Sequence, residues 1–280
     1  MARFTSNSNS NNAMAYIGNI PTPYSGPWYV SKEGSDDNEG SKYSPFLTLT
    51  KAVIKSSNKD SIIVAEGTYK ENLSWDQKAL SLIGEAANKV TIDAQINGSG
   101  IYIGKWDNGN FWPDTNYISN INFINGNGGA NGATGAGGLY LGYANAIVNN
   151  CNFIGNNEIA ANGSEPGGGV ISRNSIIDIS HSIFDNNRSE TGGGLNIQYS
   201  RDTSFVRSST FTNNTATKSG GAIKIYTGNV IIEESTFINN RITTNSNVKQ
   251  GGGINATHSS KVVIKNSILA NNEAQTGKDL

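Results

Sequence analysis

The stretch that decides the fold is residues 192–223, GGGLNIQYSRDTSFVRSSTFTNNTATKSGGAI, which begins and ends on the same phrase. A Gly-Gly pair followed closely by an aliphatic residue stands at both ends, and Phe211 with the pair Asn213-Asn214 stands between them. Both phrases recur along the chain at spacings of 25 to 32 residues. A period of this length is typical of solenoids, in which each repeat stacks on its neighbours.

The residues between these phrases alternate as in short strands. The aliphatic residues after Gly-Gly are Leu139, Val170, Leu195, Ile223 and Ile254, and the second phrase is centred on Phe153, Phe184, Phe211, Phe237 and Leu269. Positions five and seven before the Phe carry aliphatic residues in most copies, which is strand spacing, and no helix-length pattern separates the units. Strands this short bury one face only when the next unit stacks on them as a parallel ladder.

Two ranks of polar residues have a structural interpretation. Asn tolerates the left-handed conformation and its amide can hydrogen-bond along a stack of like residues, while small hydroxyl residues fit an inward rank. The expected structural ladders are Ser182, Ser209, Ser235 and Ser267, with Cys151 in the same rank, and Asn187, Asn214, Asn240 and Asn272. One outward rank, Arg207, Glu233 and Lys265, alternates in sign and is interpreted as register support.

The start of the chain differs from the repeats. Residues 46–55 can form an amphipathic helix with Pro45 near its first turn, which would cover the open edge of the first coil. We therefore divide the chain into an extended arm or attachment segment (1–28), a cap with the first coils (29–97) and β-helix repeats (98–280). Because residues 277–280 resemble another strand phrase, we expect the protein to continue, or a partner to cover the last coil.

Several of these phrases resemble known families. Residues 29–36, 44–53, 63–72 and 82–84 resemble the opening of pectin-lyase-like parallel β-helices, and the Gly-Gly-x-Ile and Phe-x-x-Asn phrases resemble the repeats of polymorphic outer-membrane (autotransporter) proteins. The resemblance covers residues 29–279. It implies an all-β, right-handed, single-stranded parallel β-helix with a short N-terminal capping helix, a fold that hosts lyases, hydrolases, adhesins and tailspikes.

A shorter resemblance concerns the arm. Residues 15–21, AYIGNIP, resemble a phrase near the start of many phage tail-fibre and virion proteins. The resemblance implies assembly in the host cytoplasm, in agreement with an N-terminus that is polar and lacks the apolar core of an export signal.

Composition excludes other classes. The formal net charge is −1 and charged residues make up 15% of the chain, so there is no basic field for nucleic acid. No apolar run approaches the length of a membrane-spanning helix. A single cysteine excludes an internal disulfide framework, and we interpret Cys151 as a small core residue.

Catalytic motifs of the resembling enzymes do not occur at matching positions. The acidic residues are scattered, Glu233 and Glu234 should face opposite sides of a strand, and His181 and His258 occupy non-equivalent positions, so no catalytic residue is assigned. Asp36, Asp37 and Asn38 could ligate Ca²⁺ through oxygen atoms, although a solvated turn is the other interpretation. No other cofactor is expected.

A binding face is expected beside the variable half of each coil. The distance from the Gly-Gly aliphatic to the next Phe is nearly constant, so the length variation falls in 126–136, 158–166, 188–191, 215–219 and 241–250. Strand positions next to these segments should point outward and contact glycans or other subunits: Tyr140, Arg173, Asn196, Gln198, Lys224, Tyr226 and Asn255. An unconstrained side of the solenoid is the alternative for the segments, and a solvated sheet face is the alternative for the side chains.

The leading interpretation is a non-catalytic β-helical surface or attachment protein, in a virion appendage such as a tail fibre or spike. Alternatives are a cell-surface adhesin or autotransporter passenger, a polysaccharide lyase or hydrolase, and a structural subunit that contacts copies of itself. The expected partners are other subunits, as a homo-oligomer such as a trimer, and surface polysaccharide. The expected location is the virion or the cell surface.

Overall fold

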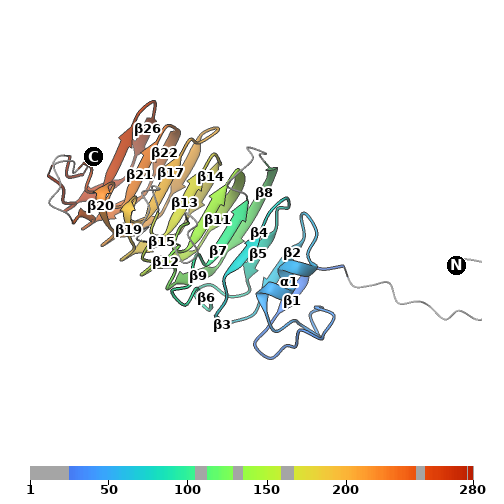
Figure 1. The fold of residues 1–280 in the computed structure, drawn as a ribbon. Coiled ribbons are helices and arrows are strands. Elements are labelled where there is room, and N and C mark those ends of the chain that lie inside the picture. Colours follow the sequence, from blue (N-terminus) through green and yellow to red (C-terminus); the bar gives the residue numbers. More distant parts are fainter. Residues whose placement is uncertain are drawn as a thin grey trace, which may run out of the picture.

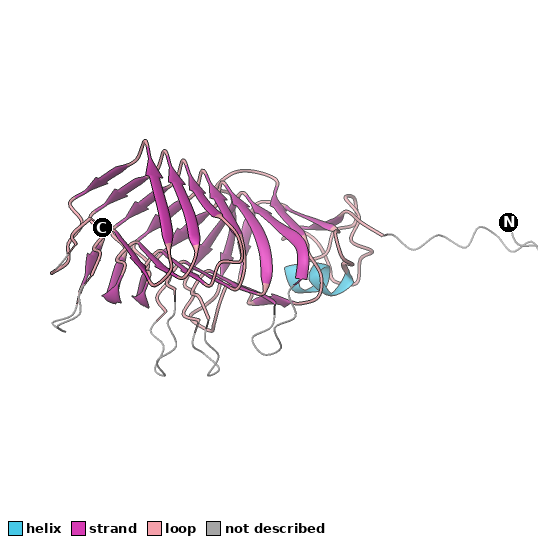
Figure 2. Cartoon of the chain, turned by 90° about the horizontal axis from the view of Figure 1, so that it is seen from above, coloured by secondary structure: helices cyan, strands magenta, loops and turns pink. Residues whose placement is uncertain are grey.

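The computed structural model describes residues 25–104, 112–128, 135–158, 167–243, 250–275 and 277–279. The chain winds through successive coils, and equivalent strands of neighbouring coils lie side by side along one axis (Figures 1 and 2). The described strands pair in parallel in four sheets, with partners that lie one coil apart in the sequence. The fold is therefore the parallel β-helix that the repeats predicted.

Three sheets enclose the core. The long sheet has nine strands: β1 (Trp28–Val30), β2 (Ser61–Val64), β5 (Ser81–Gly84), β8 (Trp112–Ser119), β11 (Ala144–Asn149), β14 (Ile177–Ser180), β18 (Ser204–Arg207), β22 (Asn229–Glu233) and β26 (Lys261–Lys265). The Phe sheet has eight: β3 (Gly67–Tyr69), β6 (Val90–Asp93), β9 (Ile121–Ile124), β12 (Asn152–Ile154), β15 (Ile183–Asp185), β19 (Thr210–Thr212), β23 (Thr236–Ile238) and β27 (Ile268–Ala270). The Gly sheet has seven: β4 (Leu73–Trp75), β7 (Ile101–Gly104), β10 (Leu139–Gly142), β13 (Val170–Arg173), β17 (Leu195–Gln198), β21 (Ile223–Tyr226) and β25 (Ile254–Thr257).

A fourth, smaller sheet occupies part of the variable half of the coils. It comprises β16 (Arg188–Thr191), β20 (Thr215–Ser219) and β24 (Arg241–Ile242), and we call it the cover sheet. These residues lie in the segments that the sequence singled out only by their variable length, and polar runs such as Arg188–Thr191 carry no apolar alternation that would have predicted a strand. Residues 129–134, 159–166 and 244–249 of the same stack lie outside the described residues.

Inward side chains stack like on like. The buried rings of Phe123, Phe153, Phe184, Phe211 and Phe237 lie in one column, with neighbouring ring centroids 4.4–4.9 Å apart. Neighbouring planes differ by at most 15°, so each coil repeats the orientation of the one before it. Aromatic pairs gain stability beyond the area that they bury, and this column helps to set the register of the Phe sheet.

The Asn ladder follows the Phe sheet directly. Asn187, Asn214 and Asn240 each donate from Nδ2 to the Oδ1 of the equivalent Asn in the next coil, at 2.9 Å, and to the carbonyl of a Phe one coil back, at 2.8–3.0 Å. Their main-chain N–H groups donate to the same Oδ1 atoms. Asn156 begins this ladder and Asn272 is its last described member. The hydrogen-bonding groups of each buried side-chain amide, and the main-chain N–H of the turn, are thus paired.

The Ser ladder works through the main chain. The N–H groups of Cys151, Ser182, Ser209 and Ser235 donate to the hydroxyl of the Ser one coil further on, at 3.1–3.2 Å. Each of these hydroxyls donates to the carbonyl two residues before it. The hydroxyls therefore do not bond to one another, as a simple ladder would suggest, but link the main chains of adjacent coils.

The Gly-Gly phrase is explained by crowding from two sides. A Cβ added at Gly221 would lie 2.1 Å from the carbonyl oxygen of Gly252 in the next coil and 2.6 Å from the main-chain nitrogen of Arg241 in the cover sheet. The equivalent Gly193 is squeezed in the same way by the next coil and by β20. Only glycine allows three backbones to approach this closely.

The first coil is covered by α1 (Leu49–Lys55), which lies at the end where the described chain begins (Figure 1). Leu49, Ala52 and Val53 are buried against that end. The helix is shorter than the expected 46–55, because Phe46 is buried against Trp28 and Thr48 is the extended N-cap residue. The Glu71 carboxylate accepts hydrogen bonds from the N–H groups of Leu49 and Thr50 at the helix start, where an anion is favoured.

Candidate functional site

The row expected to face solvent is largely buried. Tyr140, Asn196, Gln198, Lys224 and Asn255 are each no more than 7% exposed, and Arg173 and Tyr226 are half-buried. They do point away from the core of the Gly sheet, so the alternation was assigned correctly. The expected exposure was wrong, because neighbouring side chains cover the row: Asn196 lies against Thr191 of β16, and Tyr140 and Lys224 lie against residues of adjacent coils in the same sheet.

The buried polar side chains of this row contact other residues of the protein instead of solvent. Asn196 donates to Thr191 Oγ1 at the end of β16, 3.0 Å away. Lys224 Nζ donates to Asn255 Oδ1 and, at 2.8 Å, to Thr257 Oγ1 in the next coil. Tyr140 stacks on Tyr102 with ring centroids 4.2 Å apart, and burial raises the pKa of Tyr140 well above its usual value. These side chains bind coils and layers together.

The exposed remainder lies at the corner where the Gly sheet turns into the long sheet. The residue four places after each Gly-Gly aliphatic forms this corner: Tyr143, Asn174, Tyr199, Thr227 and His258. All five have φ between 49° and 60°, a left-handed conformation with which the chain bends from the Gly sheet into the long sheet. Sequence reasoning missed this column, although its fixed offset from the Gly-Gly phrase could have revealed it.

Aromatic rings gather at this corner. Tyr226 packs between Tyr199 and His258, with ring centroids 5.2 Å and 4.1 Å away. The Arg201 guanidinium lies 5.5 Å from the centroid of the Tyr143 ring, and its Nε donates to the Asn174 carbonyl. We call Tyr143, Tyr199, Arg201, Tyr226 and His258 the aromatic ridge. It runs along the solenoid axis over five coils.

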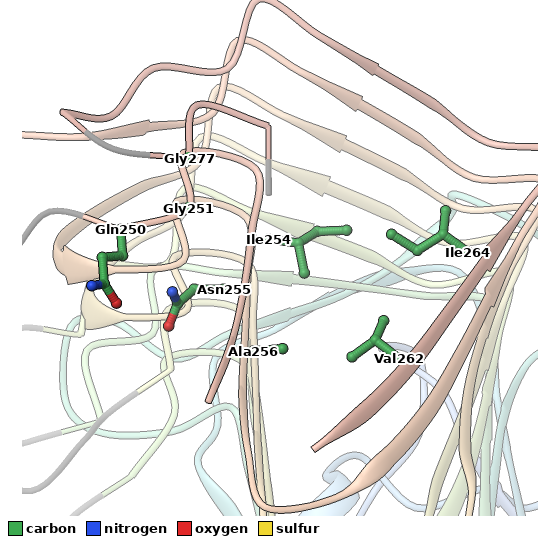
Figure 3. Close-up of a pocket in the computed structure, with 8 residues that line it drawn as sticks. All are labelled: Gln250, Gly251, Ile254, Asn255, Ala256, Val262, Ile264 and Gly277. Carbon is green, nitrogen blue, oxygen red and sulfur yellow. The ribbon is translucent and has the colours of Figure 1, made fainter. Parts of the chain in front are cut away.

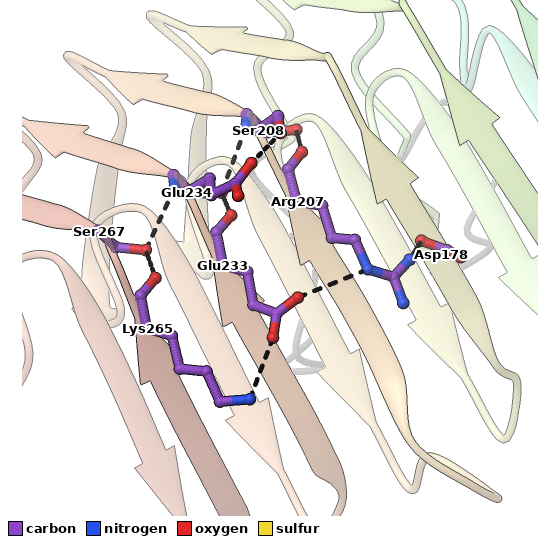
Figure 4. Close-up of polar contacts among 9 residues, drawn as sticks. Asp178, Arg207, Ser208, Glu233, Glu234, Lys265 and Ser267 are labelled. Carbon is purple, nitrogen blue, oxygen red and sulfur yellow. Dashed lines mark hydrogen bonds and ion pairs between the residues drawn. The ribbon is translucent and has the colours of Figure 1, made fainter.

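Carboxylates on the long sheet form a charge chain rather than a catalytic pair. Arg207 contacts Asp178 at 2.5 Å and Glu233 at 3.9 Å, and Lys265 contacts the other oxygen of Glu233 at 3.3 Å (Figure 4). Glu234 points to the neighbouring turn and accepts a hydrogen bond from Ser208. Arg207 also lies over the Phe205 ring, 3.8 Å from its centroid. The alternating signs thus link four successive strands.

Carboxylates elsewhere also bind neighbouring coils. Asp185 accepts hydrogen bonds from Thr212 and Asn213, and Glu190 in β16 forms an ion pair with Lys218 in β20. The two histidines lie on different corners, where His181 contacts Asn149 and His258 stacks on Tyr226. Cys151 is fully buried, which raises its pKa to about 12. Its thiol is therefore a core group at neutral pH.

The residues expected to hold Ca²⁺ have another role. Asp36 uses both carboxylate oxygens to accept hydrogen bonds from the N–H groups of Leu47 and Thr48 and from the Thr48 hydroxyl, just before α1. Asn38 donates to the Pro45 carbonyl. Within the described residues, no three His, Cys, Asp or Glu side chains group as a metal site would require. This segment fixes the start of the capping helix.

An open depression of about 450 Å³ lies at the last described coil. Its walls are the inward Ile254, Val262 and Ile264 and the polar Gln250 and Asn255 (Figure 3). The N–H groups of Gly252, Gly253 and Ile254 donate to the carbonyls of residues 277–279, which therefore begin another turn of the ladder. The depression opens at the end of the described solenoid, and the described residues that line it include no acidic, basic, histidine or cysteine side chain.

The described part of the chain includes no helix with the length and apolar character of a membrane span. Residues 15–21, which resemble a virion phrase, lie outside the described residues.

These features define a parallel β-helix with an internal Asn ladder and one covered side. No family model matches the chain. A segment of 45 residues, 16% of this chain, is 49% identical to the uncharacterized protein YwoF of Bacillus subtilis (strain 168), and it spans 10% of that relative.

Solved structures with a similar fold include two carbohydrate-acting enzymes. A pectin methylesterase from Aspergillus niger is 16% identical with a TM-score of 0.38, over 88% of this chain and 86% of the enzyme. A rhamnogalacturonan lyase is 12% identical with a TM-score of 0.31, over 85% and 72%. These values give no residue-by-residue correspondence between the chains.

Proposed function

We propose that this protein is a non-catalytic β-helical attachment protein that contacts surface glycans or other subunits. The observation that carries the proposal is the use of its carboxylates. Asp178, Glu233, Asp185 and Glu190 join neighbouring coils through ion pairs and hydrogen bonds, and Asp36 and Glu71 fix the capping helix. Carboxylates engaged in this way stabilise a rigid rod, which is what an attachment protein requires of its shaft.

The setting that we propose is a virion appendage, such as a tail fibre or spike, on the basis of the phrase at residues 15–21. A cell-surface adhesin or autotransporter passenger is the second setting, supported by the form of the Gly-Gly and Phe-Asn-Asn repeats. Either setting places the protein on the virion or the cell surface. In both, we propose that copies associate as a homo-oligomer, for example a trimer.

Affinity electrophoresis with mass photometry tests this proposal. Native gels cast with single neutral or acidic microbial polysaccharides should retard the protein in at least one case, and mass photometry should find an oligomer. A protein that runs unretarded in every gel and is monomeric at all concentrations would contradict both the attachment and the assembly parts.

A further inference from the structure

The aromatic ridge differs from the rest of the described surface in how its groups are arranged. Tyr199 is 41% exposed, and Arg201 and His258 are also exposed, so the ridge meets solvent directly. Tyr226 is held between two rings and Arg201 is held on Tyr143 and on a carbonyl oxygen. Side chains that are fixed before binding lose little entropy when a ligand arrives.

The backbone beneath the ridge repeats from coil to coil. At this corner each of five coils has one left-handed residue, including the β-branched Thr227 at φ 55°, and other corners of the same coils have left-handed residues as well. Left-handed conformations are uncommon for such residues, and they persist where the surrounding ladders determine them. Because neighbouring strands lie about 4.8 Å apart, four steps between coils make a ridge about 19 Å long. A linear chain molecule fits this shape better than a compact ligand does.

Charge at the ridge has one dominant sign. Arg201 belongs to the ridge, Arg173 ends the strand β13 beside it, and Lys261 begins β26 next to His258. Asp202 is the acidic residue that accompanies them in the turn after Tyr199. The chain as a whole has a formal net charge of −1, so the excess of cations here is local. Guanidinium groups bind carboxylates through paired hydrogen bonds, and tyrosine rings offer flat apolar faces.

We infer that the aromatic ridge binds an acidic oligosaccharide that runs along the solenoid axis, with sugar rings against Tyr199 and Tyr226 and carboxylates against Arg201. The inference rests on the proposed attachment function and adds to it a location and a ligand class. It also explains why the rings lie at the corner: the cover sheet occupies the neighbouring face, and the charge chain occupies the long sheet.

The test uses oligosaccharides in matched pairs that differ only in whether a sugar carries a carboxylate. Binding of the full chain to immobilised pairs is measured by biolayer interferometry, with Arg201→Gln and Tyr226→Ala as ridge variants. Arg241→Gln in the cover sheet and Tyr43→Ala, 96% exposed near the cap, are controls of the same residue types. All four sites are on the surface or half-buried, and circular dichroism of each variant shows whether it is folded.

We expect the protein to bind the acidic members of the pairs. Arg201→Gln and Tyr226→Ala should each weaken this binding about tenfold, and both controls should leave it unchanged. Equal binding of neutral and acidic members, insensitive to Arg201→Gln, would overturn the ligand class and leave the attachment function standing. Loss of binding in Arg241→Gln to the same extent would overturn the location. Binding to none of the pairs would overturn the inference together with the glycan part of the proposed function.

Discussion

Replacing Asn214 by Ala should destabilise the solenoid by about 4 kcal/mol. The side chain makes four hydrogen bonds: it donates to Phe184 O and Asn240 Oδ1, and its Oδ1 accepts from the main chain and the side chain of Asn187. At about 1 kcal/mol for each bond, their loss accounts for the estimate. Both Asn214 and the Asn187 N–H are buried, so water cannot substitute.

The control is Asn213→Gly, one residue away. Asn213 is exposed, has φ 56° and makes one side-chain hydrogen bond, to Asp185. Glycine keeps the left-handed conformation, so the expected loss is less than about 1 kcal/mol. Urea unfolding followed by circular dichroism measures the stability of both variants. The dependence of the unfolding free energy on urea concentration is compared as well, because solenoids can unfold in parts. A midpoint for Asn214→Ala no lower than that for Asn213→Gly would refute the ladder as a source of stability.

Three further outcomes follow from the packing and the buried groups. Gly221→Ala should lower stability by about 3 kcal/mol through its clash with two backbones, whereas Gly155→Asn, whose added Cβ meets nothing within 4 Å, should be close to neutral in the same urea assay. Cys151 should not react with a thiol reagent at about pH 8 in the folded protein, since burial raises its pKa to about 12. In denaturant, one thiol per chain should react. Rapid labelling of the native protein would contradict the buried position. Burial, with help from Glu71 and Glu85, raises the pKa of Tyr69 to about 12 from 10.0, so its contribution to stability is complete below pH 10 and declines as the pH rises through about 12. Tyr69→Phe should therefore reduce the fall of the urea midpoint with pH between about pH 9 and 12. A variant whose midpoint falls with pH as steeply as that of the unchanged protein would contradict the raised pKa of Tyr69.

The sequence predicted the parts of the fold that repeat in register. Phe and Asn residues equivalent to Phe211 and Asn214 recur in successive coils, because stacks of identical side chains require a periodic sequence. The cover sheet produces no such periodic pattern in the sequence, because its strands are short and polar and vary in length from five residues in β20 to two in β24. Without that layer, Asn196, which contacts Thr191 of β16, was expected at the surface.

The candidate site was predictable only in part. Alternation showed that Tyr226 points away from the core, but exposure depends on what lies over a strand, and that is a property of other coils. The ridge residues Tyr199 and His258 sit in a turn, where side-chain chemistry varies from coil to coil and only the left-handed backbone repeats. Because the residue type at this position changes from coil to coil, the sequence did not reveal that its backbone conformation repeats.

The most direct test of attachment without catalysis is the length of the bound polysaccharide. The polysaccharide that most retards the protein is incubated overnight with an equimolar amount of the full chain, and its molar mass is then measured by size-exclusion chromatography with light scattering. We expect a molar mass equal to that of polysaccharide incubated alone. A fall in molar mass with the appearance of new chain ends would contradict it and would identify the protein as a depolymerase.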